Sequence, residues 1–161
     1  MDLLDRLLGH DAWTTRQLLE LASPLSDAQL DREFDIAHRT LRRTFEHIIF
    51  NMEVWTDLMA GVPQRNAMGT SIAELLARLE CVEQDLARVA HDVAKRNAWD
   101  EQFTDVLDDP PKKKPFGTGI AHVITHSMHH RAQVLYMLRY TGIQPLPEGD
   151  LFSWESQTRK P

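Results

Sequence analysis

The chain of 161 residues has a net charge of −6 and a pI near 5.7, which argues against nucleic-acid binding, because such binding needs a basic surface. With 42% hydrophobic and 26% charged residues, it has the composition of one globular domain, residues 1–161, large enough for a hydrophobic core. The acidic first residues, the lack of an apolar run of roughly 18 residues and the single cysteine predict a cytoplasmic protein that does not bind membranes.

The first half of the chain contains two long helical patterns. The first covers residues 2–22, where leucines recur at helical spacing. A short helix is expected near 26–29, which has the spacing of a capping box. The second long pattern covers 39–60 and is the most apolar, with Gly61 as its end. Both patterns predict amphipathic helices that pack against a common core.

The second half adds two more long helices. One is expected over 71–97, where Ser71 and Glu74 form a further capping box. Prolines and charged residues indicate a loop over 104–117, and the last helix is expected over 118–141. No stretch as long as a strand alternates apolar and polar residues. The sequence therefore predicts an all-α protein, a four-helix bundle with one long crossover loop.

Four of the eight histidines occur within nine residues of the last helical pattern. At about 100° per residue, His122, His126, His129 and His130 share one helix face. Neutral imidazoles bind divalent metals, and histidines at i, i+4 can reach one ion. We expect His126 and His130 to be ligands, with His122 and His129 as orienting, substrate-contacting or packing residues. Spacing alone leaves the pair His122/His126 open.

A third ligand is expected from another helix, since two ligands from one helix rarely hold an ion tightly. The remaining histidines are His10, His38, His47 and His91. His38 precedes the second long helix among charged residues, His91 lies near a helix C-terminus where a cation complements the dipole, and His10 has a polar neighbour. His47 lies in an apolar arc of the second helix, where an imidazole needs a buried partner. His47 is thus the preferred third ligand, the alternative being a hydrogen-bonded core histidine.

Two segments give the chain a family resemblance. Residues 40–55, with His47 in the middle, and the run His126-Ser-Met-His129-His130-Arg-Ala-Gln133 are similar to those of the DinB/YfiT-like family, and the similarity covers almost the whole length. It implies an up-down-down-up four-helix bundle, frequently a homodimer. It also implies one divalent metal ion bound by His47, His126 and His130. Ala132 stands where the family often has glycine, which leaves these ligands intact.

The expected function is that of a metal-dependent enzyme, because three imidazoles leave a coordination position open. Zinc or nickel is expected first, with iron or manganese as alternatives. His129, His122 and Tyr136 are the candidate catalytic residues, as proton carriers or orienting groups. Characterised relatives imply a small-molecule substrate and a low-molecular-weight thiol, as in an S-transferase, while hydrolase-like chemistry stays open. The competing hypothesis is a non-catalytic, stress-response protein with a structural metal.

Overall fold

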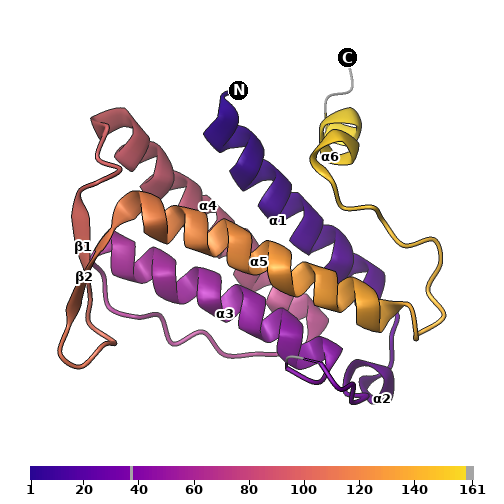
Figure 1. The fold of residues 1–161 in the computed structure, drawn as a ribbon. Coiled ribbons are helices and arrows are strands. Elements are labelled where there is room, and N and C mark those ends of the chain that lie inside the picture. Colours follow the sequence, from indigo (N-terminus) through magenta and orange to yellow (C-terminus); the bar gives the residue numbers. More distant parts are fainter. Residues whose placement is uncertain (37, 159–161) are drawn as a thin grey trace.

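The computed structural model describes residues 1–36 and 38–158 and is predominantly helical (Figure 1). Among these residues, no helix is long and apolar enough to cross a membrane. The elements, in chain order, are α1 (Leu3–Ala22), α2 (Asp27–Leu30), α3 (Leu41–Ala60), α4 (Ile72–Arg96), β1 (Gln102–Asp105), β2 (Lys112–Pro115), α5 (Phe116–Leu138) and α6 (Leu151–Thr158).

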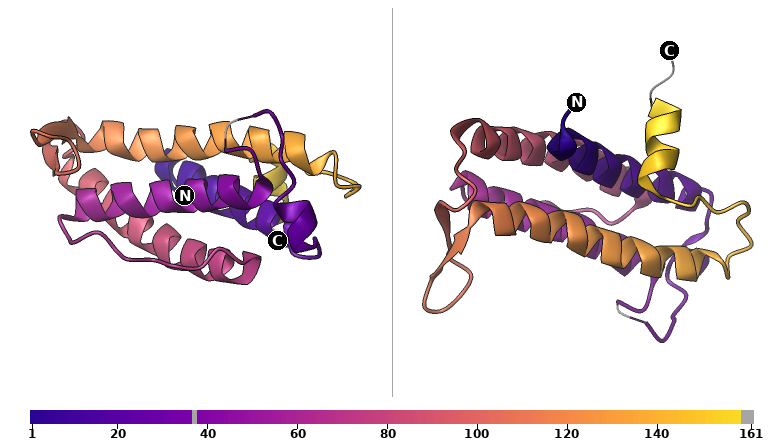
Figure 2. Two further views of the ribbon diagram at one scale, coloured as in Figure 1. Left: turned by 90° about the horizontal axis from the view of Figure 1, so that it is seen from below. Right: turned by 45° about the horizontal axis from the view of Figure 1, so that its top comes forward.

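The four long helices pack around one core. Helix α3 packs against α4 and α5, and α1 packs against the same two helices. The connection over residues 62–71 runs back along the length of α3 before α4 begins (Figures 1 and 2). The prediction of a helical fold is confirmed, while the up-down-down-up order is taken up below as a proposal.

Local sequence explains where the helices begin and end. The side chains of Ser71 and Glu74 each accept a hydrogen bond from the other residue's backbone N–H, as expected of a capping box. Ser26 does the same with Gln29 at the start of α2. Gly61 ends α3 with φ of 67°, a left-handed conformation that glycine adopts without a steric penalty. These caps satisfy backbone groups that the helices leave unpaired.

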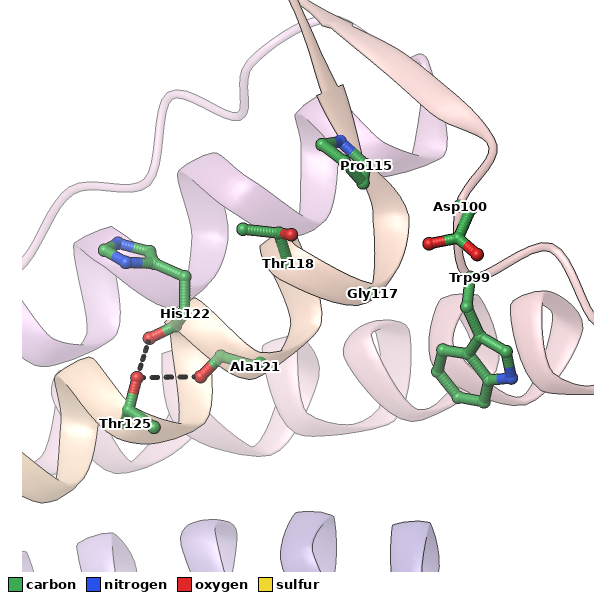
Figure 3. A pocket seen from close by; sticks show the side chains of 8 residues that line it. All are labelled: Trp99, Asp100, Pro115, Gly117, Thr118, Ala121, His122 and Thr125. Carbon is green, nitrogen blue, oxygen red and sulfur yellow. Dashed lines mark hydrogen bonds between the residues drawn. The ribbon is translucent and has the colours of Figure 1, made fainter.

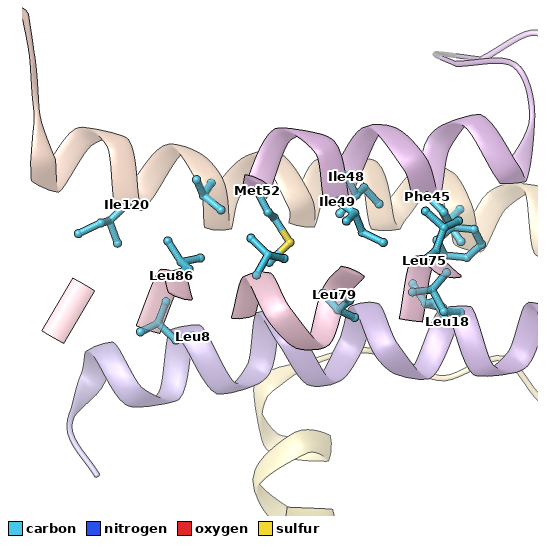
Figure 4. Close-up of a cluster of buried hydrophobic side chains, with 14 of the residues drawn as sticks. Leu8, Leu18, Phe45, Ile48, Ile49, Met52, Leu75, Leu79, Leu86 and Ile120 are labelled. Atoms are coloured by element: carbon cyan, nitrogen blue, oxygen red, sulfur yellow. The ribbon is translucent and has the colours of Figure 1, made fainter. Parts of the chain in front are cut away.

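The core is made by apolar side chains that meet between the helices (Figure 4). Phe45, Ile48 and Met52 of α3 are at most 1% exposed, as their helical spacing predicts. They point toward leucines of α1 and α4, such as Leu18 and Leu79 (Figure 4). The core thereby holds α3 in place, and with it the side chains on its other faces.

The segment around the predicted loop 104–117 corrects the sequence-based expectation. Strands β1 and β2 pair antiparallel, with Phe103 opposite Lys114. Phe103 is buried, and Lys114 forms an ion pair with the buried Asp105 and lies 4.8 Å over the Trp55 ring. Two strands of four residues, one of them Lys-Lys-Lys-Pro, have too little β-propensity to be recognised. Their pairing depends instead on these tertiary contacts.

Helix α6 was also not predicted. Asp150 accepts hydrogen bonds from the backbone N–H groups of Phe152 and Ser153 at its start. Trp154 is buried against α1, where a Cβ added at Gly9 would lie 2.7 Å from the Trp154 ring. The helix is short, and its stability comes from this docking rather than from its own sequence pattern.

Candidate metal centre

The packing of α3 against α5 brings together the three histidines that the sequence selects. The Nε2 atoms of His47 on α3 and His126 on α5 lie 3.1 Å apart. The ring centroid of His130 lies 4.7 Å from that of His47 and 4.4 Å from that of His126. His130 is buried and the other two are half-buried. Three imidazoles from two helices therefore form one cluster, as the helical spacing predicted for His126 and His130; their role as ligands stays a prediction.

A glutamine fixes the orientation of His130. Nδ1 of His130 lies 2.7 Å from Oε1 of Gln133, and Nε2 of Gln133 lies 3.0 Å from Nε2 of His129. A carboxamide oxygen can only accept, so Nδ1 of His130 is the donor and its Nε2 keeps a free lone pair. Hydrogen bonding of this kind orients metal-binding histidines and sets their tautomer. Gln133 thus leaves Nε2 of His130 with a lone pair free to accept a bond.

The environment keeps the cluster neutral. Burial, with smaller contributions from the neighbouring His38 and His130, lowers the pKa of His47 to about 4. Burial likewise lowers the pKa of His126 to about 4, with contributions from His130 and His47. The pKa of His130 is also lowered, chiefly by burial. Neutral imidazole is the form that binds a metal, so these side chains are ready to act as ligands at neutral pH.

Two further observations test whether the residues fit a divalent ion. The facing Nε2 atoms of His47 and His126 can form a hydrogen bond only if one of them carries a proton. Nδ1 of His126 is buried and has no hydrogen-bond partner among the described residues. Neutral imidazoles that face one another in this way are suited to zinc, nickel and iron. The donor set therefore fits a divalent ion.

The structure adds His38, which sequence reasoning considered and passed over in favour of His47. Its ring stacks on that of His47, with centroids 3.8 Å apart, and lies 5.2 Å from that of His130. His38, His47 and His130 each offer a ring nitrogen, and these atoms lie within 4.8 Å of one another. His38 lies outside any helix, so periodicity gave no signal for it. Only the path of the loop before α3 brings it to the cluster.

The other two histidines that were considered lie elsewhere. Nε2 of His10 lies 2.8 Å from the backbone oxygen of Gly149, so this ring joins α1 to the segment before α6. Nε2 of His91 lies 2.8 Å from a carboxylate oxygen of Asp5 at the protein surface. Both rings therefore make contacts outside the cluster, with Gly149 and Asp5.

The candidate catalytic residues occupy different positions around the cluster. His122 is exposed, with its ring 5.3 Å from that of His126 and 5.2 Å from that of Trp55. His129 is exposed and bonds to Gln133, while the ring of Tyr136 lies 5.3 Å from that of Tyr140. His122 and His129 thus border the cluster directly, whereas the ring contact of Tyr136 is with another tyrosine. Their catalytic roles stay a prediction.

One open pocket is lined by His122 next to the cluster, and a second is lined by rings of the cluster itself. One of about 530 Å³ has Thr118, His122 and Thr125 of α5 on one side and Trp99 and Asp100 on the other (Figure 3). The second, of about 390 Å³, is lined by His38, His47, Arg43, Glu46 and Phe50. The second pocket is the more relevant to metal chemistry, because it adjoins two rings of the cluster.

Comparison with known proteins identifies a family for this chain. The family model described as DinB superfamily matches residues 10–134, which include most of α1, all of α3 and α4 and most of α5. All the histidines of the cluster lie inside the matched region. A search of curated proteins finds no match to this chain.

Proposed function

This chain belongs to the DinB superfamily, and we propose that it binds one divalent metal ion through His47, His126 and His130 and acts as a metal-dependent enzyme. The observation that carries the proposal is the meeting of these three imidazoles across the α3–α5 contact, with the Nε2 atoms of His47 and His126 3.1 Å apart. Packing alone gives no reason to collect neutral imidazoles at one point. A shared ion accounts for their arrangement.

The proposed ion is zinc or nickel, with iron or manganese as alternatives, since imidazole suits the first three and manganese is the hardest of them. When bound, such an ion lowers the pKa of a coordinated water toward about 7 or stabilises a thiolate. The chain's own groups would complete the site: Gln133 holds His130 in the right tautomer, and the exposed His122 and His129 would carry protons between the site and solvent. Tyr136 is the weakest of the proposed catalytic residues, because its ring contact is with Tyr140.

We further propose a small-molecule substrate and a thiol-dependent S-transferase reaction, or a hydrolase-like one. The pocket of about 390 Å³ beside His47 supports a small substrate, since it has the size of a small ligand site. The other finer features proposed from family membership are an up-down-down-up helix order, a homodimer and a cytoplasmic location. The return of residues 62–71 along α3 supports the helix order (Figure 1).

Metal analysis tests the proposed site directly. The protein is purified without chelator and without a histidine tag, and its metal content is measured by mass spectrometry. His126→Ala should lose most of the metal, as should His47→Ala. His91→Ala is the matched control, because it removes an exposed imidazole outside the cluster. Full metal occupancy in His126→Ala, with the fold verified by circular dichroism, would exclude the proposed ligand set.

An activity assay distinguishes the proposed enzyme from the competing function, a non-catalytic protein with a structural metal. The metal-loaded protein is incubated with glutathione, bacillithiol or mycothiol and an electrophilic aryl halide, and thioether formation is followed. An enzyme should lose turnover with chelator and in His126→Ala. Metal binding without turnover, and without any coordination position open to an added thiol, would favour the structural function.

A further inference from the structure

The loop before α3 places a fourth imidazole on the proposed metal centre. The rings of His38 and His47 are stacked at 3.8 Å with an angle of 28° between their planes. Ring nitrogens of His38, His47 and His130 lie within 4.8 Å of one another. Ligands about 2 Å from a common ion lie within about 4 Å of one another, so the nitrogens of His38, His47 and His130 are spaced only slightly more widely than ligands of one ion.

His38 differs from the other three histidines in how it is held. His47, His126 and His130 lie on two long helices that pack against each other. The backbone around His38 is instead a turn, in which Phe34 N–H donates to the Arg39 oxygen at 2.7 Å and Thr40 N–H donates to the His38 oxygen at 2.8 Å. Arg39 has φ of 69°, a left-handed conformation. His38 therefore approaches the cluster from a loop, and not from the rigid helices.

The side chain of His38 is also less restrained. Nδ1 of His130 is hydrogen-bonded to Gln133, and the Nε2 atoms of His47 and His126 face each other. Within residues 1–36 and 38–158, no hydrogen bond to the ring nitrogens of His38 accompanies its stacking on His47. As far as the described residues go, a change of rotamer of His38 would therefore break no hydrogen bond, and both ring nitrogens are available to a metal.

The space beside His38 is open. His38 and His47 line the pocket of about 390 Å³, together with Arg43, Glu46 and Phe50. A small ligand that enters this pocket meets His38 before it meets His126 or His130, which do not line it. The same pocket offers room for the imidazole of His38 when it leaves the ion.

We propose that His38 is a fourth, exchangeable ligand of the ion, bound in the resting protein and displaced when a small anionic ligand such as a thiolate enters the adjoining pocket. This inference rests on the proposed metal site at His47, His126 and His130. It is compatible with features of both competing functions. Four histidines would fill the coordination positions of the ion in the resting protein, and the departure of His38 would free one position for substrate. Access to the ion is then controlled by the His38 side chain.

Co²⁺ serves as the probe, because its visible absorption depends on the number and type of its ligands. Metal-free wild type, His38→Ala, His38→Gln, His47→Ala and His91→Ala are titrated with Co²⁺, followed by azide as an added ligand. We expect His38→Ala and His38→Gln to bind Co²⁺ more weakly than wild type and with a shifted spectrum. We expect azide to bind both variants at lower concentration than wild type, because it no longer competes with an imidazole. His91→Ala should match wild type.

The outcomes separate this inference from the proposed function. If both His38 variants keep the wild-type Co²⁺ spectrum and azide affinity while His47→Ala loses Co²⁺, His38 is no ligand and the three-histidine site stands. If His47→Ala also retains the wild-type Co²⁺ affinity and spectrum, the metal site itself is wrong and the inference falls with it. Circular dichroism of each variant ensures that a lost signal does not reflect unfolding.

Discussion

The ion pair between α1 and α5, next to the histidine cluster, should be among the most sensitive points of the fold. Arg131 directly follows His130 and donates hydrogen bonds to Oδ1 of Asp11 and, at 3.2 Å, to the hydroxyl of Thr15. The side chains of Arg131 and Asp11 are 4% and 2% exposed. Replacing Arg131 with Met keeps most of the apolar volume of the side chain but leaves the Asp11 carboxylate buried without its counter-ion.

The magnitude follows from this burial. Breaking a buried ion pair by removing one partner costs about 3–5 kcal/mol, because a charge remains in the interior. In a domain of this size, each kcal/mol lowers the melting temperature by about 2–4 °C. Arg131→Met should therefore lower the melting temperature by about 6–20 °C. Urea unfolding gives the free energy directly, and thermal melting followed by circular dichroism gives the temperature.

Two variants make the test specific. Arg88→Met removes an arginine that is 72% exposed and pairs with Asp85, so it should cost no more than about 1 kcal/mol. Asp11→Leu combined with Arg131→Met removes both charges and should recover most of the lost stability. The reasoning is refuted if Arg131→Met is no less stable than Arg88→Met, or if the double variant is no more stable than Arg131→Met.

The pH dependence gives an independent check of the same pair. Burial raises the pKa of the Asp11 carboxyl, and Arg131 opposes that rise. Without Arg131 the native-state pKa should rise further, so the native variant takes up a proton as the pH falls toward the unfolded value of about 3.9. Protonation removes the buried charge. The stability difference between wild type and Arg131→Met should therefore narrow with falling pH, and a constant difference would show that Asp11 is not the source of the loss.

Three further predictions concern the histidine cluster. Gln133→Leu should weaken metal binding by about 10–100-fold, since His130 loses the acceptor that fixes its tautomer; competition with a chromogenic chelator measures this, and an unchanged affinity would contradict it. Saturating metal at about 100 times Kd should stabilise the wild type by about 2.7 kcal/mol but not His130→Ala, as measured by melting with and without chelator; equal gains in both proteins would place the ion elsewhere. In the metal-free protein, the pKa values of His47 and His126 are about 4 in the native state and about 6.5 when unfolded. As the pH is lowered from about 6.5 to 4, only the unfolded chain takes up these protons. The free energy of unfolding should therefore decrease over this pH range, and this contribution should level off below about pH 4. Urea unfolding of wild type and a His47→Gln/His126→Gln variant checks this, and the variant should lack most of the fall.

Some features of the fold are visible in the sequence because they depend on neighbours along the chain. The helical spacing of apolar residues, the capping boxes at Ser26 and Ser71 and the end of α3 at Gly61 agree with the structure. The hairpin over residues 102–115 and helix α6 were missed. These short elements form because Phe103, Lys114 and Trp154 find partners elsewhere in the molecule, which no local pattern reveals.

The face of α3 opposite its apolar stripe shows the same limit. The charged face of an amphipathic helix is usually exposed to solvent, yet Glu53 and Asp57 are each 2% exposed. Glu53 pairs with Arg78 of α4, and Asp57 with Arg65 of the long connection. Helical periodicity indicates which residues share a face of a helix, but it does not indicate which other parts of the protein pack against that face.

The sequence by itself determined that this protein is helical and that His126 and His130 share one face of a helix, since the helical repeat fixes which side chains point the same way. It also indicated His47, because an imidazole in an apolar arc needs a partner. Only the tertiary structure decided that His47 meets His126 across the α3–α5 contact and that His38 joins them. Those distances depend on how two helices pack and on the path of a loop, and neither leaves a periodic signal in the chain.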